Sequence, residues 1–112
     1  MSELSFDSIN QALARISGYI NHTPIFSSQT LNESLQNTIL FKMENQQKAH
    51  SFKARGAFNA VLAYKERFGF FPKKMVAYSS GNHGYALSLV GKTFNIPTLI
   101  FMTQNCSLSK IT

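Results

Sequence analysis

The stretch Lys74-Met75-Val76-Ala77-Tyr78-Ser79-Ser80-Gly81-Asn82-His83-Gly84 joins a short apolar run to a small polar turn. Residues 74–78 predict a strand, residues 79–84 a turn and residues 85–94 a helix. After a second turn at Pro97, residues 98–102 predict another strand. A strand, a helix and a strand in this order predict two parallel strands joined by a right-handed crossover.

A similar unit precedes this stretch. Residues 38–44 predict an earlier strand, and a helix from Phe52 to a stop at Gly69 has an apolar face made of Ala54, Ala57, Phe58, Val61, Leu62 and Tyr64. The whole order is βαβαβ, which predicts an α/β fold with three parallel strands. Ligands bind beyond the carboxyl ends of such strands, where residues 51–57 and 79–84 both fall. Further upstream, apolar spacing predicts helices over residues 9–20 and 30–35, separated by Thr23-Pro24.

Length and composition bound the class of protein. The chain has 112 residues, of which 44% are hydrophobic and 14% charged, so it is typical of one small globular domain or of part of a larger one. No apolar run reaches the roughly 18 residues that span a bilayer, and the N-terminus lacks the pattern of a secretory signal. The single cysteine, Cys106, excludes an internal disulfide. We therefore expect a cytoplasmic protein with no membrane contact.

The net charge of +6 raises the question of nucleic-acid binding. The basic residues are scattered along the chain, and no run exceeds the pair Lys73-Lys74. Scattered charge favours an anionic small ligand over a nucleic acid, so we expect no nucleic-acid partner. His22 and His50 lack other metal ligands at useful spacing, and we expect no metal site.

The segment Ser51-Phe52-Lys53-Ala54-Arg55-Gly56-Ala57 places a lysine at the start of an amphipathic helix. A lysine forms an imine with an aldehyde through its neutral amine. The positive end of the helix dipole and the nearby Arg55 both repel a positive charge at Lys53. Lys53 is thus a candidate imine-forming residue, and the alternative is a solvated lysine at a helix start.

The turn Ser79-Ser80-Gly81-Asn82-His83-Gly84 suits an anion. Successive backbone amides ahead of a helix form an anion-binding nest, and Gly81 allows close approach of a ligand. The Asn82 amide and the serine hydroxyls add donors. The alternative is a well-capped helix start, because Ser, Gly and Asn are common at caps and turns.

Both motifs together resemble fold-type II pyridoxal-phosphate enzymes of the serine racemase and threonine dehydratase family, which have the tryptophan synthase beta-like fold. Residues 51–57 match the family's Ser-Phe-Lys-x-Arg-Gly-Ala motif, and residues 79–84 match its substrate-carboxylate loop. Thr23-Pro24 and the segment Lys42-Met43-Glu44-Asn45 also resemble family segments. The resemblance extends from about Phe6 to Lys110.

The resemblance implies a cofactor, pyridoxal 5′-phosphate, and roles for named residues. Lys53 would hold the cofactor as an imine and later act as the base at the substrate α carbon. Phe52 would pack near the cofactor ring, and Asn82 would hydrogen-bond the ring 3′ oxygen. The substrate, L-serine or L-threonine, would be held through its carboxylate by Ser79, Ser80, Gly81, Asn82 and His83.

Two residues bear on the choice of reaction. The serine at position 80 is similar to serine racemases, which have a serine at this place. There it is the acid or base on the second face of the substrate. The segment from His50 to Lys53 resembles several biosynthetic threonine dehydratases, which share the sequence His-Ser-Phe-Lys. Racemases of this type also eliminate water, so racemase and dehydratase both stay open.

The resemblance implies that residues 1–112 form a single incomplete domain region. Residues 1–50 would begin the large domain, and residues 51–112 would form part of the small domain. The family's phosphate-binding loop comes later than any segment of this sequence, so we expect the chain alone to be inactive. The alternative is a non-catalytic remnant that associates with a full-length homologue; family members are typically homo-oligomers.

Overall fold

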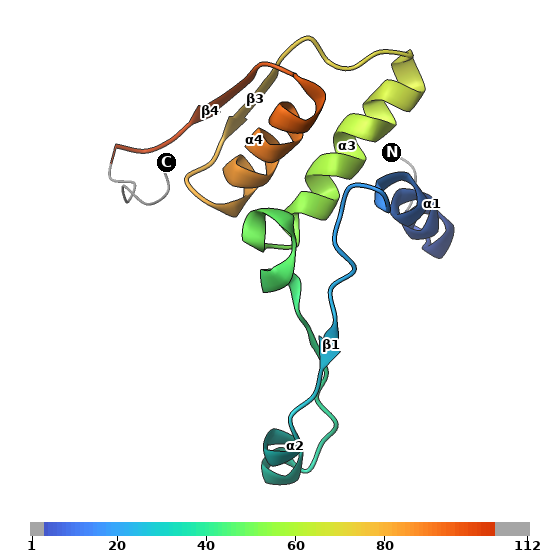
Figure 1. Cartoon of the computed structure of the whole chain (residues 1–112), viewed down its shortest axis with the longest axis vertical. Helices are drawn as coiled ribbons and strands as arrows, with labels where there is room; N and C mark the ends of the chain where they lie inside the picture. The colour runs from blue at the N-terminus through green and yellow to red at the C-terminus, as the bar shows by residue number, and fades with distance from the viewer. Residues whose placement is uncertain (1–3, 105–112) are drawn as a thin grey trace.

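A computed structural model of the chain describes residues 4–104, so Cys106 lies outside the described residues. The molecule has a helical body and a projecting arm (Figure 1). The body contains α1 (Phe6–Ile16), α3 (Lys53–Phe68), β3 (Met75–Tyr78), α4 (Asn82–Phe94) and β4 (Thr98–Phe101). The arm contains β1 (Ile25–Phe26), α2 (Gln29–Leu35) and β2 (Phe41–Lys42). Two short 3-10 helices, η1 (Glu44–Gln46) and η2 (Lys48–His50), connect the arm to α3.

Strands β3 and β4 are parallel, with α4 as the crossover between them, as the sequence predicts. Met75 is paired with Thr98 and Tyr78 with Phe101. The Ser79 amide donates to the Phe101 carbonyl at 2.9 Å, which extends the pairing into the polar turn. The fold class is therefore α/β, as the sequence predicts.

The expected third parallel strand over residues 38–44 is wrong in extent and in partner. Only Phe41–Lys42 is a strand, and it pairs antiparallel with Ile25–Phe26 in a separate two-stranded sheet. The Met43 amide continues this pairing by donating to the Pro24 carbonyl at 3.0 Å. An apolar run predicts extended backbone, but its partner depends on which other extended segment lies within reach.

The start of one helix also differs from the prediction. Helix α4 begins at Asn82 rather than after Gly84, because the Ser79 hydroxyl accepts hydrogen bonds from the amides of Gly81 and Gly84. These bonds stabilise a helix start within the segment predicted as a turn. Helix α3 ends at Gly69, as predicted, in the left-handed conformation with φ 81°.

The core lies between α3 and α4. The predicted apolar face of α3 is buried apart from Tyr64, which is half-buried, and it packs against Ala86 and Val90 of α4. Phe58 stacks on Tyr19 with ring centroids 5.5 Å apart and meets Phe94 edge-on at 6.0 Å. Aromatic contacts of this kind add to the free energy gained by burying the rings.

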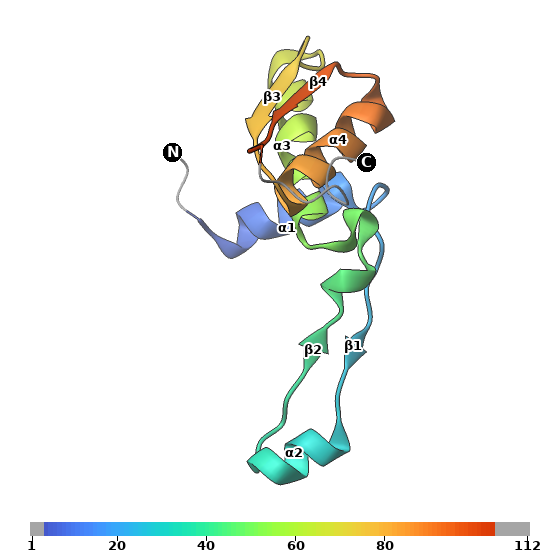
Figure 2. The same ribbon diagram turned by 90° about the vertical axis from the view of Figure 1, so that its left-hand side faces the viewer.

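Helices α3 and α4 lie on the same side of the β3–β4 sheet (Figures 1 and 2). The other face presents two side chains from each strand, paired by the register: Val76 beside Leu99, and Tyr78 beside Phe101. These four side chains are between 41% and 72% exposed. We call them the open sheet face. A parallel sheet is normally covered on both faces, so this face is an unusual exposure of apolar surface.

Helix α4 approaches the sheet closely because it has glycines where it crosses the strands. A Cβ atom added to Gly91 would overlap the Thr98 Oγ1 and lie 2.9 Å from the Ile96 carbonyl oxygen. We expect Gly91→Ala to lower the free energy of unfolding by about 1–3 kcal/mol through this clash, measured by urea unfolding. Gly56→Ala in α3 is the matched control. Nothing lies within 4 Å of its added Cβ, so it should be neutral or stabilising.

Candidate functional site

The two sequence motifs meet at a hollow of about 300 Å³ between α3 and α4. The lysine motif contributes Phe52 and Lys53, and α4 contributes His83 and Leu87. Gly56, Ala57 and Ala60 form its wall along α3. The tight packing of α3 on α4 brings these residues together although 30 positions separate Lys53 from His83 in the sequence.

Lys53 is the first residue of α3, and its side chain is exposed. The Lys53 Nζ lies 4.9 Å from the centroid of the Phe52 ring, which is itself 59% exposed. Directly before them, Ser51 is only 6% exposed, and its Oγ has no hydrogen-bond partner among residues 4–104. A buried hydroxyl without a partner is uncommon, and here it belongs to a residue two positions before Lys53.

Arg55 is two residues from Lys53 in the sequence, but in the structure its guanidinium is paired with the Glu44 carboxylate. Arg55 binds the Glu44 carboxylate through two hydrogen bonds, Nη2 to Oε1 at 2.6 Å and Nε to Oε2 at 2.9 Å. The hydrogen bond from Arg55, and then that from Thr23, outweigh burial and lower the pKa of Glu44 to about 2, while the same pair raises the pKa of Arg55. Arg55 is therefore paired with Glu44, an interaction that the sequence argument did not predict.

The Glu44 ion pair should make stability depend on pH. The pKa of Glu44 is lower in the folded chain, about 2, than its ordinary value of 4.5, so its contribution is complete above pH 4.5. This contribution is lost as the pH falls from 4.5 toward 2. We expect a loss of about 1–2 kcal/mol, because a partly solvated pair is worth less than its full pKa shift. Urea unfolding across this pH range measures the loss, and a Glu44→Gln chain should lack it.

The other motif forms the start of α4. The Ser79 hydroxyl accepts from the Gly81 amide at 3.3 Å and from the Gly84 amide at 3.0 Å. Within residues 4–104, the backbone amides of Asn82 and His83 have no hydrogen-bond partner, as is usual in the first turn of a helix. Asn82 and His83 are exposed, while Ser79, Ser80 and Gly81 are half-buried. The segment predicted to form an amide nest is thus partly accessible on the described surface.

The structure brings some predicted site residues together and leaves others apart. Phe52, Lys53 and His83 line the same hollow, whereas Ser79, Ser80, Gly81 and Asn82 do not line it. The small size of Gly84 lets the start of α4 pack closely on β4, since an added Cβ would lie 3.0 Å from the Ile100 Cγ2. Gly81, which was expected to allow close approach of a ligand, has open space around it.

Sequence reasoning missed the contacts that fix the segment directly before Lys53. The Gln47 side chain is 2% exposed and bonds both backbone groups of Asn21, at 2.8 Å and 2.9 Å. The next turn is left-handed at Ala49 and His50, with φ values of 58° and 54°, and the His50 ring stacks on Tyr85. Residues in this sparsely populated backbone region are found more often at functional sites. The polar segment at residues 45–51 was the only signal for it.

Comparison with known proteins gives a consistent result. Residues 16–112 match the family described as pyridoxal-phosphate dependent enzyme. The chain is 38% identical over 109 residues to L-threo-3-hydroxyaspartate ammonia-lyase of Saccharomyces cerevisiae and 36% identical over 111 residues to serine racemase of Dictyostelium discoideum. These matches cover 96% and 99% of this chain.

Solved structures agree. The crystal structure of a pyridoxal 5′-phosphate-dependent aspartate racemase is similar with a TM-score of 0.90 and 36% identity, over 99% of this chain and 35% of that chain. The chain spans 32% and 34% of the length of the ammonia-lyase and the serine racemase. No helix within residues 4–104 has the length and hydropathy to cross a bilayer. The motifs, the fold and these matches place the chain in the pyridoxal-phosphate-dependent enzyme family of fold type II, together with serine racemases and related ammonia-lyases.

Proposed function

We propose that this chain carries the cofactor-binding lysine of a serine racemase or a serine or threonine dehydratase, and that the chain alone does not turn over substrate. The observation that carries the proposal is the shared hollow, which is lined by Lys53 of one motif and His83 of the other. The ammonia-lyase and the serine racemase are about three times as long as the part matched here, which supports inactivity of the chain alone.

The residues around Lys53 fit pyridoxal phosphate. The hollow, about 300 Å³, lies at the small end of the range of ligand pockets. An exposed amine, an exposed aromatic ring and a buried hydroxyl without a partner in residues 4–104 lie within three consecutive positions, 51 to 53. The cofactor, when bound, supplies an electron sink for the substrate α carbon. Lys53 would hold it, and Phe52 and Asn82 would contact its ring.

The chain's own residues would transfer protons and bind the substrate carboxylate. We assign to the Lys53 Nζ the removal of the proton from the substrate α carbon, and to the Ser80 hydroxyl the transfer of a proton on the opposite face. The start of α4 holds the substrate carboxylate, because the unpaired amides of Asn82 and His83 and the positive end of the helix dipole favour an anion. The Ser79 hydroxyl shapes this turn through its two bonds to backbone amides.

A titration of the purified chain with pyridoxal phosphate tests the proposal. Borohydride reduction followed by peptide mapping identifies the labelled lysine, and assays with L-serine and L-threonine measure turnover. We expect label concentrated on Lys53 and no turnover. Label spread evenly over many lysines would contradict the cofactor site, and turnover at enzyme-like rates would contradict inactivity of the chain alone.

A second function has support from the open sheet face. A non-catalytic remnant that associates with a full-length homologue would cover the apolar side chains of Val76, Tyr78, Leu99 and Phe101, which are exposed in the isolated chain. Sedimentation of the chain mixed with a full-length relative distinguishes this function. Association that Val76→Lys and Leu99→Lys abolish would support it.

A further inference from the structure

Helix α3 begins without the usual cap. Its N-cap residue, Phe52, provides no side-chain hydrogen bond to the helix start. The preceding Ser51 hydroxyl has no partner in the described chain, although serine is a favourable capping residue. The first turn has only two backbone bonds into residues 51 and 52, from the amides of Ala54 at 3.4 Å and of Arg55 at 3.1 Å. The turn that carries Lys53 therefore lacks a side-chain cap in the described chain, so contacts made by its other side chains bear on its order.

The Arg55 side chain supplies a second attachment for this turn. Its guanidinium and the Glu44 carboxylate form a two-pronged pair, and their side chains are 28% and 17% exposed. Bidentate pairs of this kind are among the stronger polar contacts in proteins. Since Glu44 begins η1, which directly follows the arm, the pair connects the arm to the first turn of α3.

Glu44 is itself fixed by the arm. Its Oε1 also accepts from the Thr23 Oγ1, and the Thr23 carbonyl accepts from the Lys42 Nζ. Thr23 precedes β1 and Lys42 ends β2, so Lys42 on one side of the arm bonds Thr23 on the other, and Thr23 bonds the Glu44 carboxylate. A carboxylate held from several directions can orient the Arg55 side chain that it binds.

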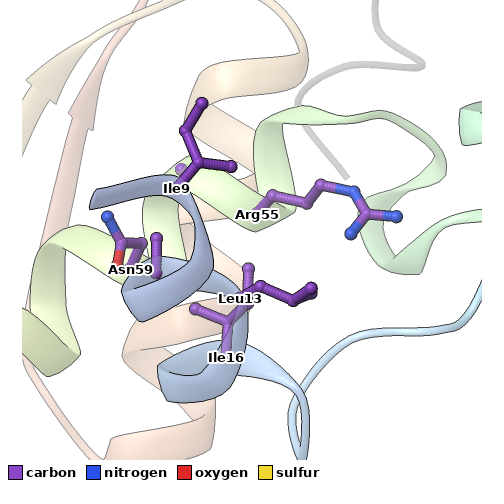
Figure 3. Close-up of a pocket in the computed structure, with 7 residues that line it drawn as sticks. Ile9, Leu13, Ile16, Arg55 and Asn59 are labelled. Carbon is purple, nitrogen blue, oxygen red and sulfur yellow. The ribbon is translucent and has the colours of Figure 1, made fainter. Parts of the chain in front are cut away.

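Arg55 and Lys53 leave the first turn in different directions. Residues two apart on a helix are separated by about 200° around its axis. Accordingly Lys53 lines the hollow shared with His83, whereas Arg55 lines a second hollow of about 280 Å³ shared with α1. Figure 3 shows the Arg55 guanidinium extending away from Ile9 and Asn59. Arg55 therefore pairs with Glu44 on the side of the first turn that is opposite the Lys53 hollow.

We propose that the Glu44–Arg55 pair is a positioning clamp that orders the first turn of α3 and so holds Lys53 toward the hollow shared with His83. Glu44 and Arg55 are positioning residues, because neither lines that hollow. The significance of the clamp rests on the proposed function of Lys53, but its effect on the turn does not require the cofactor.

Amide hydrogen exchange of the full chain tests the clamp without cofactor. Glu44→Gln keeps the shape of the side chain and removes its charge. We expect the amides of the first turn of α3 to exchange about tenfold faster, as the loss of hydrogen bonds between charged groups implies. Arg55→Lys keeps the charge and loses the two-pronged geometry, so it should have the same effect with a smaller change in overall stability.

Glu66→Gln is the matched control. Glu66 lies on the same helix and pairs with the Arg15 Nε at 2.7 Å, far along α3 from Lys53. This variant should leave exchange in the first turn unchanged. Wild-type exchange there in both Glu44→Gln and Arg55→Lys would overturn the clamp, as would equal acceleration along all of α3.

Cofactor labelling supplies a second readout. The Lys53 amine condenses with the aldehyde of added pyridoxal phosphate and releases water, and borohydride delivers hydride to the resulting carbon. Glu44→Gln should lower the label on Lys53 relative to the other lysines, and the charge-reversed chain Glu44→Arg with Arg55→Glu should restore it. Unchanged preference for Lys53 in Glu44→Gln would overturn the clamp. Absence of preference in the wild-type chain with faster exchange in Glu44→Gln would refute the proposed function alone.

Discussion

Replacement of Lys53 by alanine is expected to abolish selective labelling of the chain by pyridoxal phosphate. Lys53 is the lysine that lines the hollow between α3 and α4, among the residues that the structure describes there. An amine in a shaped site reacts selectively because the site holds the aldehyde close to it, whereas a solvated lysine reacts only in proportion to its concentration. Borohydride trapping and peptide mapping of Lys53→Ala measure the loss.

Lys65→Ala is the matched control for this prediction. Lys65 lies on the same helix, is exposed, and places its Nζ 4.5 Å from the centroid of the Phe71 ring, much as Lys53 lies 4.9 Å from that of Phe52. Its removal should leave the label on Lys53 unchanged. An equal loss of label in the two variants would mean that an amine near an aromatic ring suffices, and that the hollow adds nothing.

Phe58→Ala is expected to lower the free energy of unfolding by about 3–5 kcal/mol, the usual cost of truncating a buried phenylalanine. The Phe58 side chain is 1% exposed and contacts the rings of Tyr19 and Phe94. A loss of this size approaches the whole stability of a small domain, so the variant should be largely unfolded. Thermal unfolding followed by circular dichroism measures it.

Phe6→Ala provides the comparison for Phe58→Ala. Phe6 is 77% exposed at the start of α1, so its removal exposes little that was buried. A surface change of this kind usually alters stability by less than about 0.5 kcal/mol. A small effect of Phe58→Ala, similar to that of Phe6→Ala, would show that α3 and α4 do not share the core described above.

The site was predictable from sequence to the extent that its chemistry is local. Lys53 at a helix start and the polar turn before α4 are each contained in six or seven consecutive residues. The partner of Arg55 was not predictable in this way. Its interaction with Glu44 crosses 11 positions and depends on how the arm returns to α3, so the sequence argument assigned the Arg55 charge to its near neighbour, Lys53.

The amino-acid sequence by itself determined the helices α3 and α4, the parallel pair β3 and β4, and the stop at Gly69, because periodicity and turn residues act over a few positions. Tertiary structure decided which segment pairs with residues 41–42, how α3 faces α4, and where the Arg55 charge lies. Each of these depends on contacts between segments distant in the chain. Local patterns say which surfaces are apolar or charged, and only the folded chain decides which of those surfaces meet.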